Sequence, residues 1–264
     1  MSLRCLMSDD SVSYLKTKTE RGTPPLLSAV KTLLLLEVLS TLEGPVGVSE
    51  LARLVGSSRG TIHKRLASLA SVGFVEQDRE GRYRLSLAMA KIGSAALVQA
   101  GLDARLQGVL DWLVARTQET ATIAALHRDH ALIVQRTESR SVLNVAIRVG
   151  TSLPLAFNAS TLVLQAFAMT AGERAELRAS GKLTPSEADI MKVRDEGYAL
   201  SVNEFIKDVS AVSIPLNDST LARTVAVTVV GPSSRIDLTF ALEALRIARD
   251  DLGQHGRVQL SAAM

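Results

Sequence analysis

The chain has 264 residues, a formal net charge of +3 and 47% hydrophobic residues. This length and composition suit one large or two ordinary folded domains and exclude a wholly disordered chain. The single cysteine, Cys5, excludes an intramolecular disulfide and a cysteine-based zinc site. The apolar runs are far shorter than the roughly 20 residues of a membrane span, and residues 1–10 lack the apolar core of a signal peptide. We therefore expect a cytoplasmic protein with no membrane partner.

The charge is concentrated toward the N-terminus. Residues 24–101 contain nine Lys or Arg against six Asp or Glu, whereas residues 102–264 contain 17 against 18. A small basic module on a neutral body is what contact with a nucleic acid requires. A solvated charged surface would give the same charge balance, so only the spacing of the residues can distinguish it from a nucleic-acid-binding surface.

The first structured region is predicted to be helical. Apolar residues at helical spacing and intervening breakers predict three helices, at 26–42, 50–55 and 59–72. We expect Ser49 and Ser57 to cap the second and third helices, and Gly56 and Gly73 to end them. Two short helices joined in this way form a helix-turn-helix.

A hairpin follows the three helices. Residues 74–77 and 83–86 alternate as strands do, and a turn of polar residues and glycine separates them. A helix-turn-helix followed by a hairpin is a winged helix, which we place at 24–86 after a flexible tail over 1–23. A linker helix over 87–101 is expected next.

The rest of the chain, 102–253, predicts an α+β domain, with a short tail over 254–264. Helices are expected at 102–118, 158–169, 173–179, 187–196 and 238–252. Strands are expected at 120–126, 131–137, 142–148, 198–202, 209–216 and 224–230. Long helices at both ends of a mostly antiparallel set of strands indicate an α+β sensor-type domain, with a sheet flanked by helices.

The third helix is the predicted recognition helix, because the second helix of a helix-turn-helix enters the major groove. Arg59 suits a guanine edge, while Lys64 and Arg65 are long enough to reach phosphates. Arg82 and Arg84 flank the wing and suit the DNA backbone or minor groove. The full predicted DNA-binding set is Ser57, Ser58, Arg59, Thr61, Ile62, His63, Lys64, Arg65, Arg82 and Arg84. The alternative is a winged helix that contacts only proteins.

Several segments in this order resemble the isocitrate lyase regulator (IclR) family of bacterial transcription factors. They are 51–56 (LARLVG), 57–66 (SSRGTIHKRL), 73–75 (GFV), 81–85 (GRYRL), 148–150 (RVG), Pro154, 197–199 (GYA), Pro215 and 231–236 (GPSSRI). The resemblance covers about residues 26–252. It implies a C-terminal effector-binding domain related to GAF folds, a homodimer or dimer of dimers, a palindromic operator in double-stranded DNA, and a small organic acid as effector.

The resemblance also implies an effector pocket. Carried over by position, and with Asn158 added as an available polar group, it comprises Val142, Val145, Leu153, Asn158, Ala159, Ser160, Ser201, Val209, Ala211, Thr228, Val230 and Ser233. The family often has Asp at position 201 and Cys at position 211, so this pocket looks more apolar and favours an aromatic or longer acyl carboxylic acid. Backbone N–H groups at the start of the helix over 158–169 would favour the carboxylate. The alternative is that these residues are ordinary core and caps.

Two further classes of function stay open. His127, Asp129 and His130 surround a predicted turn and offer a conceivable zinc site for an enzyme domain. No catalytic motif is found, however, and we expect no enzyme, no metal and no other cofactor. A dimeric DNA-binding scaffold that responds to no effector is the other alternative.

Overall fold

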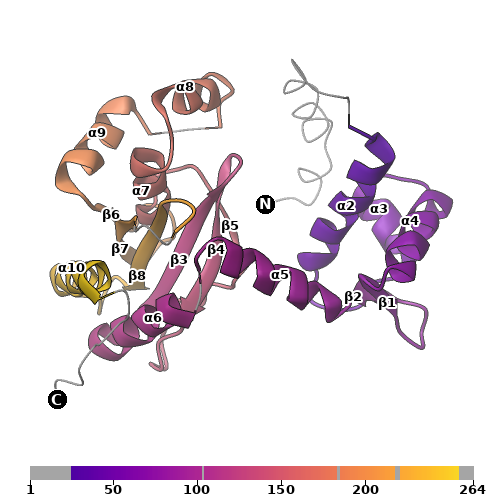
Figure 1. Ribbon diagram of the computed structural model, residues 1–264, viewed down its shortest axis with the longest axis horizontal. Coiled ribbons are helices and arrows are strands. Elements are labelled where there is room, and N and C mark those ends of the chain that lie inside the picture. The colour runs from indigo at the N-terminus through magenta and orange to yellow at the C-terminus, as the bar shows by residue number, and fades with distance from the viewer. Residues whose placement is uncertain (1–24, 103, 183–184, 218–220, 256–264) are drawn as a thin grey trace. The chain divides into compact units, whose positions relative to one another are not determined.

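The computed structural model describes residues 25–102, 104–182, 185–217 and 221–255. The expected tail over 1–23 lies outside these residues. The chain divides into two compact units after Ala95, inside the helix α5 (Ala88–Gln99) (Figure 1). None of the described helices is long and apolar enough to cross a membrane.

The N-terminal unit is a winged helix, as the sequence predicts. Its elements are α2 (Leu27–Ser40), α3 (Val48–Val55), α4 (Arg59–Ser71), β1 (Val75–Gln77) and β2 (Tyr83–Leu85). The helices pack around a core that includes Leu35, Leu51, Ile62 and Leu66, all completely buried. The strands pair in antiparallel register, Val75 opposite Leu85, and the hairpin projects beyond the helices in Figure 1.

Both predicted helix caps of this unit are wrong by one or two residues. Helix α3 begins at Val48 after Gly47, so Ser49 lies inside the helix and does not cap it. Helix α4 is capped by Ser58, whose Oγ accepts a hydrogen bond from Thr61 N at 3.1 Å. Ser57 instead belongs to the turn, where its N–H donates to Ala52 O at 2.9 Å.

The C-terminal unit is built on one antiparallel sheet. Its strands are β3 (Thr120–His127), β4 (His130–Thr137), β5 (Ser152–Pro154), β6 (Ala199–Val202), β7 (Val209–Leu216) and β8 (Val225–Pro232), in the spatial order β5-β4-β3-β8-β7-β6. All five pairings are antiparallel. The class is therefore α+β, as predicted.

Helices cover both faces of this sheet (Figure 1). Those on one face are α6 (Ala104–Thr117) and α10 (Leu238–His255); those on the other are α7 (Ala159–Phe167), α8 (Ala171–Ala179) and α9 (Glu187–Glu196). Successive side chains of a strand point to opposite faces, so Val225, Val227 and Val229 of β8 join the α6/α10 core while Ala226 faces α7. Helix α10 runs two residues into the expected tail over 254–264.

A buried arginine connects the three helices α7, α8 and α9. Arg174 of α8 is 2% exposed and donates to Met169 O at 2.8 Å, just beyond α7. Its guanidinium also forms an ion pair with Glu187 of α9, Nη2 to Oε1 at 2.5 Å. The hydrogen bond from Arg174 lowers the pKa of Glu187 below its ordinary value of 4.5.

The strand predicted over 142–148 is wrong. Residues 138–149 form no strand or helix and are held by side-chain bonds to their backbone, from Arg136 to Ile147 O and from Arg235 to Leu143 O. The edge position beside β4 is taken by β5, which the sequence did not predict. An apolar run alone does not determine which segment pairs with a sheet edge.

Candidate functional sites

Helix α4 exposes its basic residues and buries its apolar ones. Arg59, His63 and Lys64 are exposed and Arg65 is half-buried. Ile62, which the sequence predicts to contact DNA, is completely buried beside Leu66 and faces the core instead. Ile62, Leu66 and Leu69 are spaced so that they lie on one helix face. The prediction that Ile62 contacts DNA is therefore wrong, and Ile62 is a core residue.

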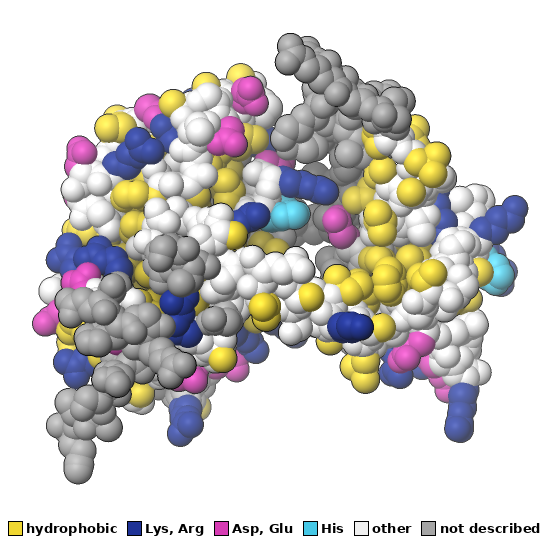
Figure 2. Space-filling view, in the orientation of Figure 1, with side chains coloured by type: hydrophobic (Ala, Val, Ile, Leu, Met, Phe, Trp, Pro, Cys, Tyr) yellow, Lys and Arg dark blue, Asp and Glu magenta, His cyan; other side chains and the backbone are white. Residues whose placement is uncertain are grey.

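The first turn of α4 is built by hydroxyl groups. Ser58 Oγ lies 2.8 Å from Thr61 Oγ1 in addition to accepting from Thr61 N. These hydroxyls fix the start of the helix where base edges would lie. Within the described residues, Arg59, Lys64 and Arg65 carry no ion pair, so their charges are available to a polyanion. Figure 2 shows Lys and Arg side chains on this part of the unit.

The two predicted wing arginines are both paired with carboxylates. Arg84 Nε lies 2.6 Å from Glu76 Oε1. Arg82 Nη2 lies 2.9 Å from Asp78 Oδ2 and 3.0 Å from Glu80 Oε2. These pairs are on the surface, so each contributes little to folding stability, yet they occupy the guanidinium groups that the sequence assigns to DNA.

In the C-terminal unit, a buried layer of hydroxyl groups lies between α7 and the sheet. Ser160 Oγ of α7 is 2.9 Å from Thr228 Oγ1 of β8. Thr228 Oγ1 in turn donates to Ser213 Oγ of β7 at 2.8 Å, and Ser213 Oγ donates to Val227 O at 3.2 Å. We call Ser160, Ser213 and Thr228 the hydroxyl layer. Each of the three residues is at most 6% exposed.

The register of the sheet brings several predicted pocket residues together. Ser201 lies opposite Ala211, and Ala211 lies opposite Val230. In the next row of the same face, Ser213 lies opposite Thr228. Ser213 is absent from the predicted pocket, although the alternating pattern of β7 puts it on the face of Val209 and Ala211.

The remaining predicted pocket residues lie in different surroundings. Leu153 packs against the core beneath α7 and Val145 is half-buried. Ser233 Oγ is bonded to Ser210 Oγ at 2.7 Å and donates to Asn203 Oδ1 at 2.8 Å. Val142 is fully exposed in the irregular segment, so it lines no pocket in this conformation.

The N-terminus of α7 is partly capped. Asn158, 6% exposed, accepts from Thr161 N at 3.0 Å. Helix geometry leaves the N–H groups of Ala159 and Ser160 without an acceptor inside the helix. Gln165 is fully buried, and within the described residues neither atom of its amide has a hydrogen-bond partner. It follows Ser160 by five residues, which places it on another face of α7 from the hydroxyl layer.

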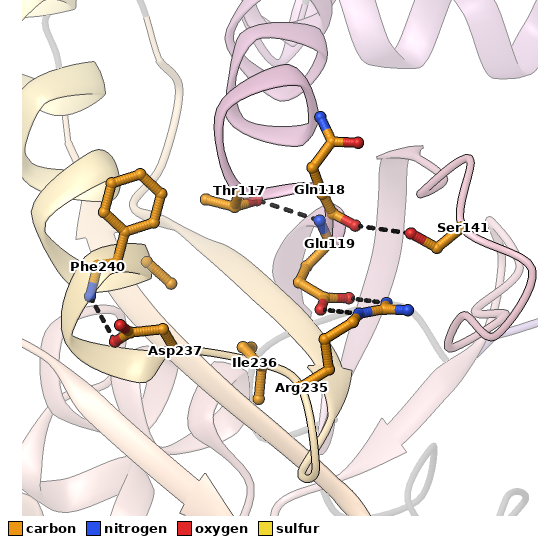
Figure 3. Close-up of a pocket in the computed structure, with 9 residues that line it drawn as sticks. Thr117, Gln118, Glu119, Ser141, Arg235, Ile236, Asp237 and Phe240 are labelled. Atoms are coloured by element: carbon orange, nitrogen blue, oxygen red, sulfur yellow. Dashed lines mark hydrogen bonds and ion pairs between the residues drawn. The ribbon is translucent and has the colours of Figure 1, made fainter.

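A cavity of about 150 Å³ lies on the other side of the sheet, between the end of α6 and the start of α10 (Figure 3). It is lined by Thr117, Gln118, Glu119, Ser141, Arg235, Ile236, Asp237, Phe240 and Ala241. Glu119 is 3% exposed and forms a two-pronged ion pair with Arg235, at 2.7 Å and 2.6 Å. This bonding raises the pKa of Arg235. Glu119 and Arg235 are thus paired with each other, and Asp237 Oδ1 accepts from Thr239 N and Phe240 N at the start of α10.

The residues of the conceivable zinc site are engaged in other contacts. The rings of His127 and His130 meet edge to face with centroids 5.2 Å apart. Asp129 accepts from Lys182 Nζ at 2.8 Å. Partial burial would raise the pKa of Asp129, but the bonds from Lys182 and His130 outweigh it and lower the pKa. The part of the chain that the structure describes holds no group of three or more His, Cys, Asp and Glu placed to bind a metal ion.

Comparison with known proteins accounts for both units. Residues 28–79 match the IclR helix-turn-helix domain family, and residues 94–251 match the bacterial transcriptional regulator IclR C-terminal family. The chain belongs to the IclR family of bacterial transcriptional regulators. Like other members, it combines a DNA-binding helix-turn-helix domain with a C-terminal effector domain.

Individual relatives agree with this assignment. The glycerol operon regulatory protein of Streptomyces griseus is 32% identical over 233 residues, 82% of this chain and 89% of that protein. The crystal structure of Pseudomonas aeruginosa HmgR superposes with a TM-score of 0.71 at 27% identity, covering 86% of this chain and 98% of HmgR. An IclR homologue from Microbacterium hydrocarbonoxydans, solved in complex with 4-hydroxybenzoate, shares the fold with a TM-score of 0.72 at 18% identity, covering 86% and 97%.

Proposed function

We propose that this IclR-family chain is a cytoplasmic regulator whose affinity for a palindromic operator is changed by a small carboxylic acid bound beside the hydroxyl layer. The observation that carries the proposal is the chain of hydrogen bonds from Ser160 through Thr228 to Ser213. Its hydroxyl groups can reorient to donate to a carboxylate. Ala211 and Val230 lie in the next row of the same sheet face and suit an aromatic or longer acyl body.

The fold neighbour from Microbacterium hydrocarbonoxydans supports an aromatic acid as the first probe, because its structure contains 4-hydroxybenzoate. In the present conformation the layer is closed, since Ala159, Ser160 and Thr228 are all buried. Binding therefore requires that α7 or residues 138–149 move away from the sheet. Such a movement is the kind of differential contact by which a ligand shifts a conformational equilibrium.

The experiment is a thermal-shift screen with 4-hydroxybenzoate, benzoate and aliphatic carboxylic acids on the wild type and on Thr228→Val. An acid at about 100 times its Kd should stabilise the wild type by about 2.7 kcal/mol. We expect Thr228→Val to reduce this stabilisation. Thr117→Val is the matched control, because Thr117 Oγ1 donates within α6 on the other face of the sheet, and it should respond as the wild type does.

The closed packing of the hydroxyl layer favours one alternative, a DNA-binding regulator without an effector. Its hydroxyls already satisfy one another, as those of an ordinary core do. If no acid in the panel shifts the unfolding temperature of the wild type, this alternative gains support and the effector proposal fails for that class of ligand.

For DNA, we propose that Arg59 contacts a base edge and Lys64 a phosphate. Arg59→Ala should weaken specific binding by about 1–3 kcal/mol and relax the base preference at one position. Lys64→Ala should weaken binding to all sequences alike and flatten the dependence on salt. An unchanged base preference for Arg59→Ala, measured by selection from random duplexes, would remove that assignment.

We also propose that the protein is a homodimer or a dimer of dimers. Helix α5 has no buried residue, and its apolar side chains include Ile92 and Val98, at 46% and 64% exposed. On α2, Leu33 is 57% exposed. Exposed apolar helix faces of this kind indicate association, and a two-fold partner would present a second α4 to a palindromic site. Sedimentation velocity at low protein concentration tests this, with a monomer as the contrary result.

A further inference from the structure

The β1–β2 hairpin carries three arginines and three carboxylates, but only two of the arginines are paired. Arg84 is held by Glu76 and Arg82 by Asp78 and Glu80, at 2.6 to 3.0 Å. Asp78 Oδ1 also accepts from the backbone N–H groups of Glu80 and Arg82, at 3.0 Å and 2.8 Å. These contacts stabilise the turn itself, so all three carboxylates are already engaged within the hairpin.

Arg79 stands apart from this arrangement. Gly81 N donates to Asp78 O at 3.1 Å, which closes a turn with Arg79 and Glu80 at its two central positions. Arg79 is exposed, and within the described residues its side chain has neither a hydrogen-bond nor an ion-pair partner. The end of the hairpin therefore presents one uncompensated positive charge. Figure 2 shows a Lys or Arg side chain at the end of this projection.

We propose that the wing contacts DNA through Arg79, and that Arg82 and Arg84 serve the hairpin internally. The proposal rests on the operator binding proposed above for α4. An unpaired guanidinium can bind a phosphate or a narrow minor groove without first breaking an ion pair with a carboxylate. Arg82 and Arg84 would have to release Asp78, Glu80 and Glu76 beside the phosphates, where unpaired carboxylates are repelled.

The geometry thus replaces the wing residues predicted from the sequence. Sequence position alone favours Arg82 and Arg84, because both lie close to a strand of the wing. The ion pairs show that their charge is compensated locally. Arg79 supplies the charge that the other two cannot.

The test compares Arg79→Ala with the double variant Glu76→Ala/Arg84→Ala in full-length protein. The double variant removes an ion pair of the same hairpin without leaving a carboxylate unpaired. Binding to a selected operator duplex is measured by fluorescence anisotropy at several salt concentrations. We expect Arg79→Ala to weaken binding about tenfold. It should reduce the slope of log K against log salt by about 0.9 for each protomer on the duplex, the value for one lost phosphate contact, and so by about 1.8 for a dimer. The double variant should keep the wild-type slope.

A third variant, Arg79→Lys, distinguishes the two parts of the duplex that Arg79 can reach. If Arg79→Lys restores both the wild-type affinity and the wild-type salt slope, Arg79 contacts a phosphate. If it restores the salt slope but loses a preference of the wild type for A·T-rich flanking sequence, Arg79 contacts the minor groove. Wild-type affinity and slope for Arg79→Ala would overturn the proposal, as would an equal loss of slope for Glu76→Ala/Arg84→Ala. Failure of the wild type to bind any duplex would instead refute the proposed operator binding.

Discussion

Gly231 is the residue whose replacement should disturb the C-terminal unit most directly. A Cβ atom at this position would lie 2.5 Å from Cδ and from Oε2 of Glu119. Ordinary contact between non-bonded heavy atoms begins near about 3.5 Å, so the carboxylate would have to retreat by about 1 Å. Glu119 is 3% exposed and is held by two bonds from Arg235, so a retreat of its carboxylate strains or breaks that ion pair.

The expected cost of Gly231→Ala follows from these contacts. Over-packing of a well-filled core costs about 1–3 kcal/mol. Breaking a buried ion pair costs about 3–5 kcal/mol, and here this is an upper limit because the Arg235 side chain is 37% exposed. We therefore expect Gly231→Ala to lower the free energy of unfolding of the C-terminal unit by about 2–4 kcal/mol.

Urea unfolding followed by circular dichroism measures this change, and two variants serve as controls. Gly60→Ala, in α4 with nothing within 4 Å of its Cβ, should stabilise the N-terminal unit by about 0.5–1 kcal/mol. On a Glu119→Ala background the space is vacated, so Gly231→Ala should cost less than about 1 kcal/mol. Wild-type stability for Gly231→Ala, or an equal cost on both backgrounds, would show that Glu119 does not limit the space at position 231.

Two further predictions concern helix ends and acid stability. Ser58→Ala should destabilise the N-terminal unit by about 1 kcal/mol through loss of the α4 cap, while Ser57→Ala should change it by less than about 0.5 kcal/mol; urea unfolding separates the two, and the reverse order would contradict the structure. Because the pKa of Glu187 is lowered in the folded protein, this carboxylate stabilises the fold above its ordinary pKa of 4.5, and the stabilisation is lost as the pH falls through the lowered value. Glu187→Gln should therefore be less stable than the wild type at neutral pH and equal to it in strong acid; a difference that is constant with pH would contradict this account.

Local structure could be predicted from the sequence because its determinants are local. Helix α9 and strand β7 have the predicted bounds, 187–196 and 209–216. Apolar periodicity and a glycine in the left-handed conformation at 197 are enough to define α9. The helix-turn-helix and the hairpin of the N-terminal unit can be predicted in the same way, because short-range patterns in the sequence define them.

Long-range pairing could not be predicted in the same way. Glu119 and Arg235 are 116 residues apart, and nothing near either residue in the sequence indicates the partner. Residues 142–148 look like a strand by composition, but side chains of Arg136 and Arg235 hold this segment in an irregular path. The pairing of Arg82 and Arg84 with carboxylates likewise depends on the geometry of the turn and on strand register, and it changes which arginine the wing offers.

We propose that an acid bound in the C-terminal unit changes the affinity of the protein for its operator. The most direct test measures the Kd of the wild type for a palindromic duplex selected from a random pool, with and without an acid that stabilises the protein. We expect the acid to change the Kd at least about fivefold, with a smaller change in Thr228→Val and the full change in Thr117→Val. An acid that stabilises the protein but leaves the Kd for the operator unchanged would contradict it.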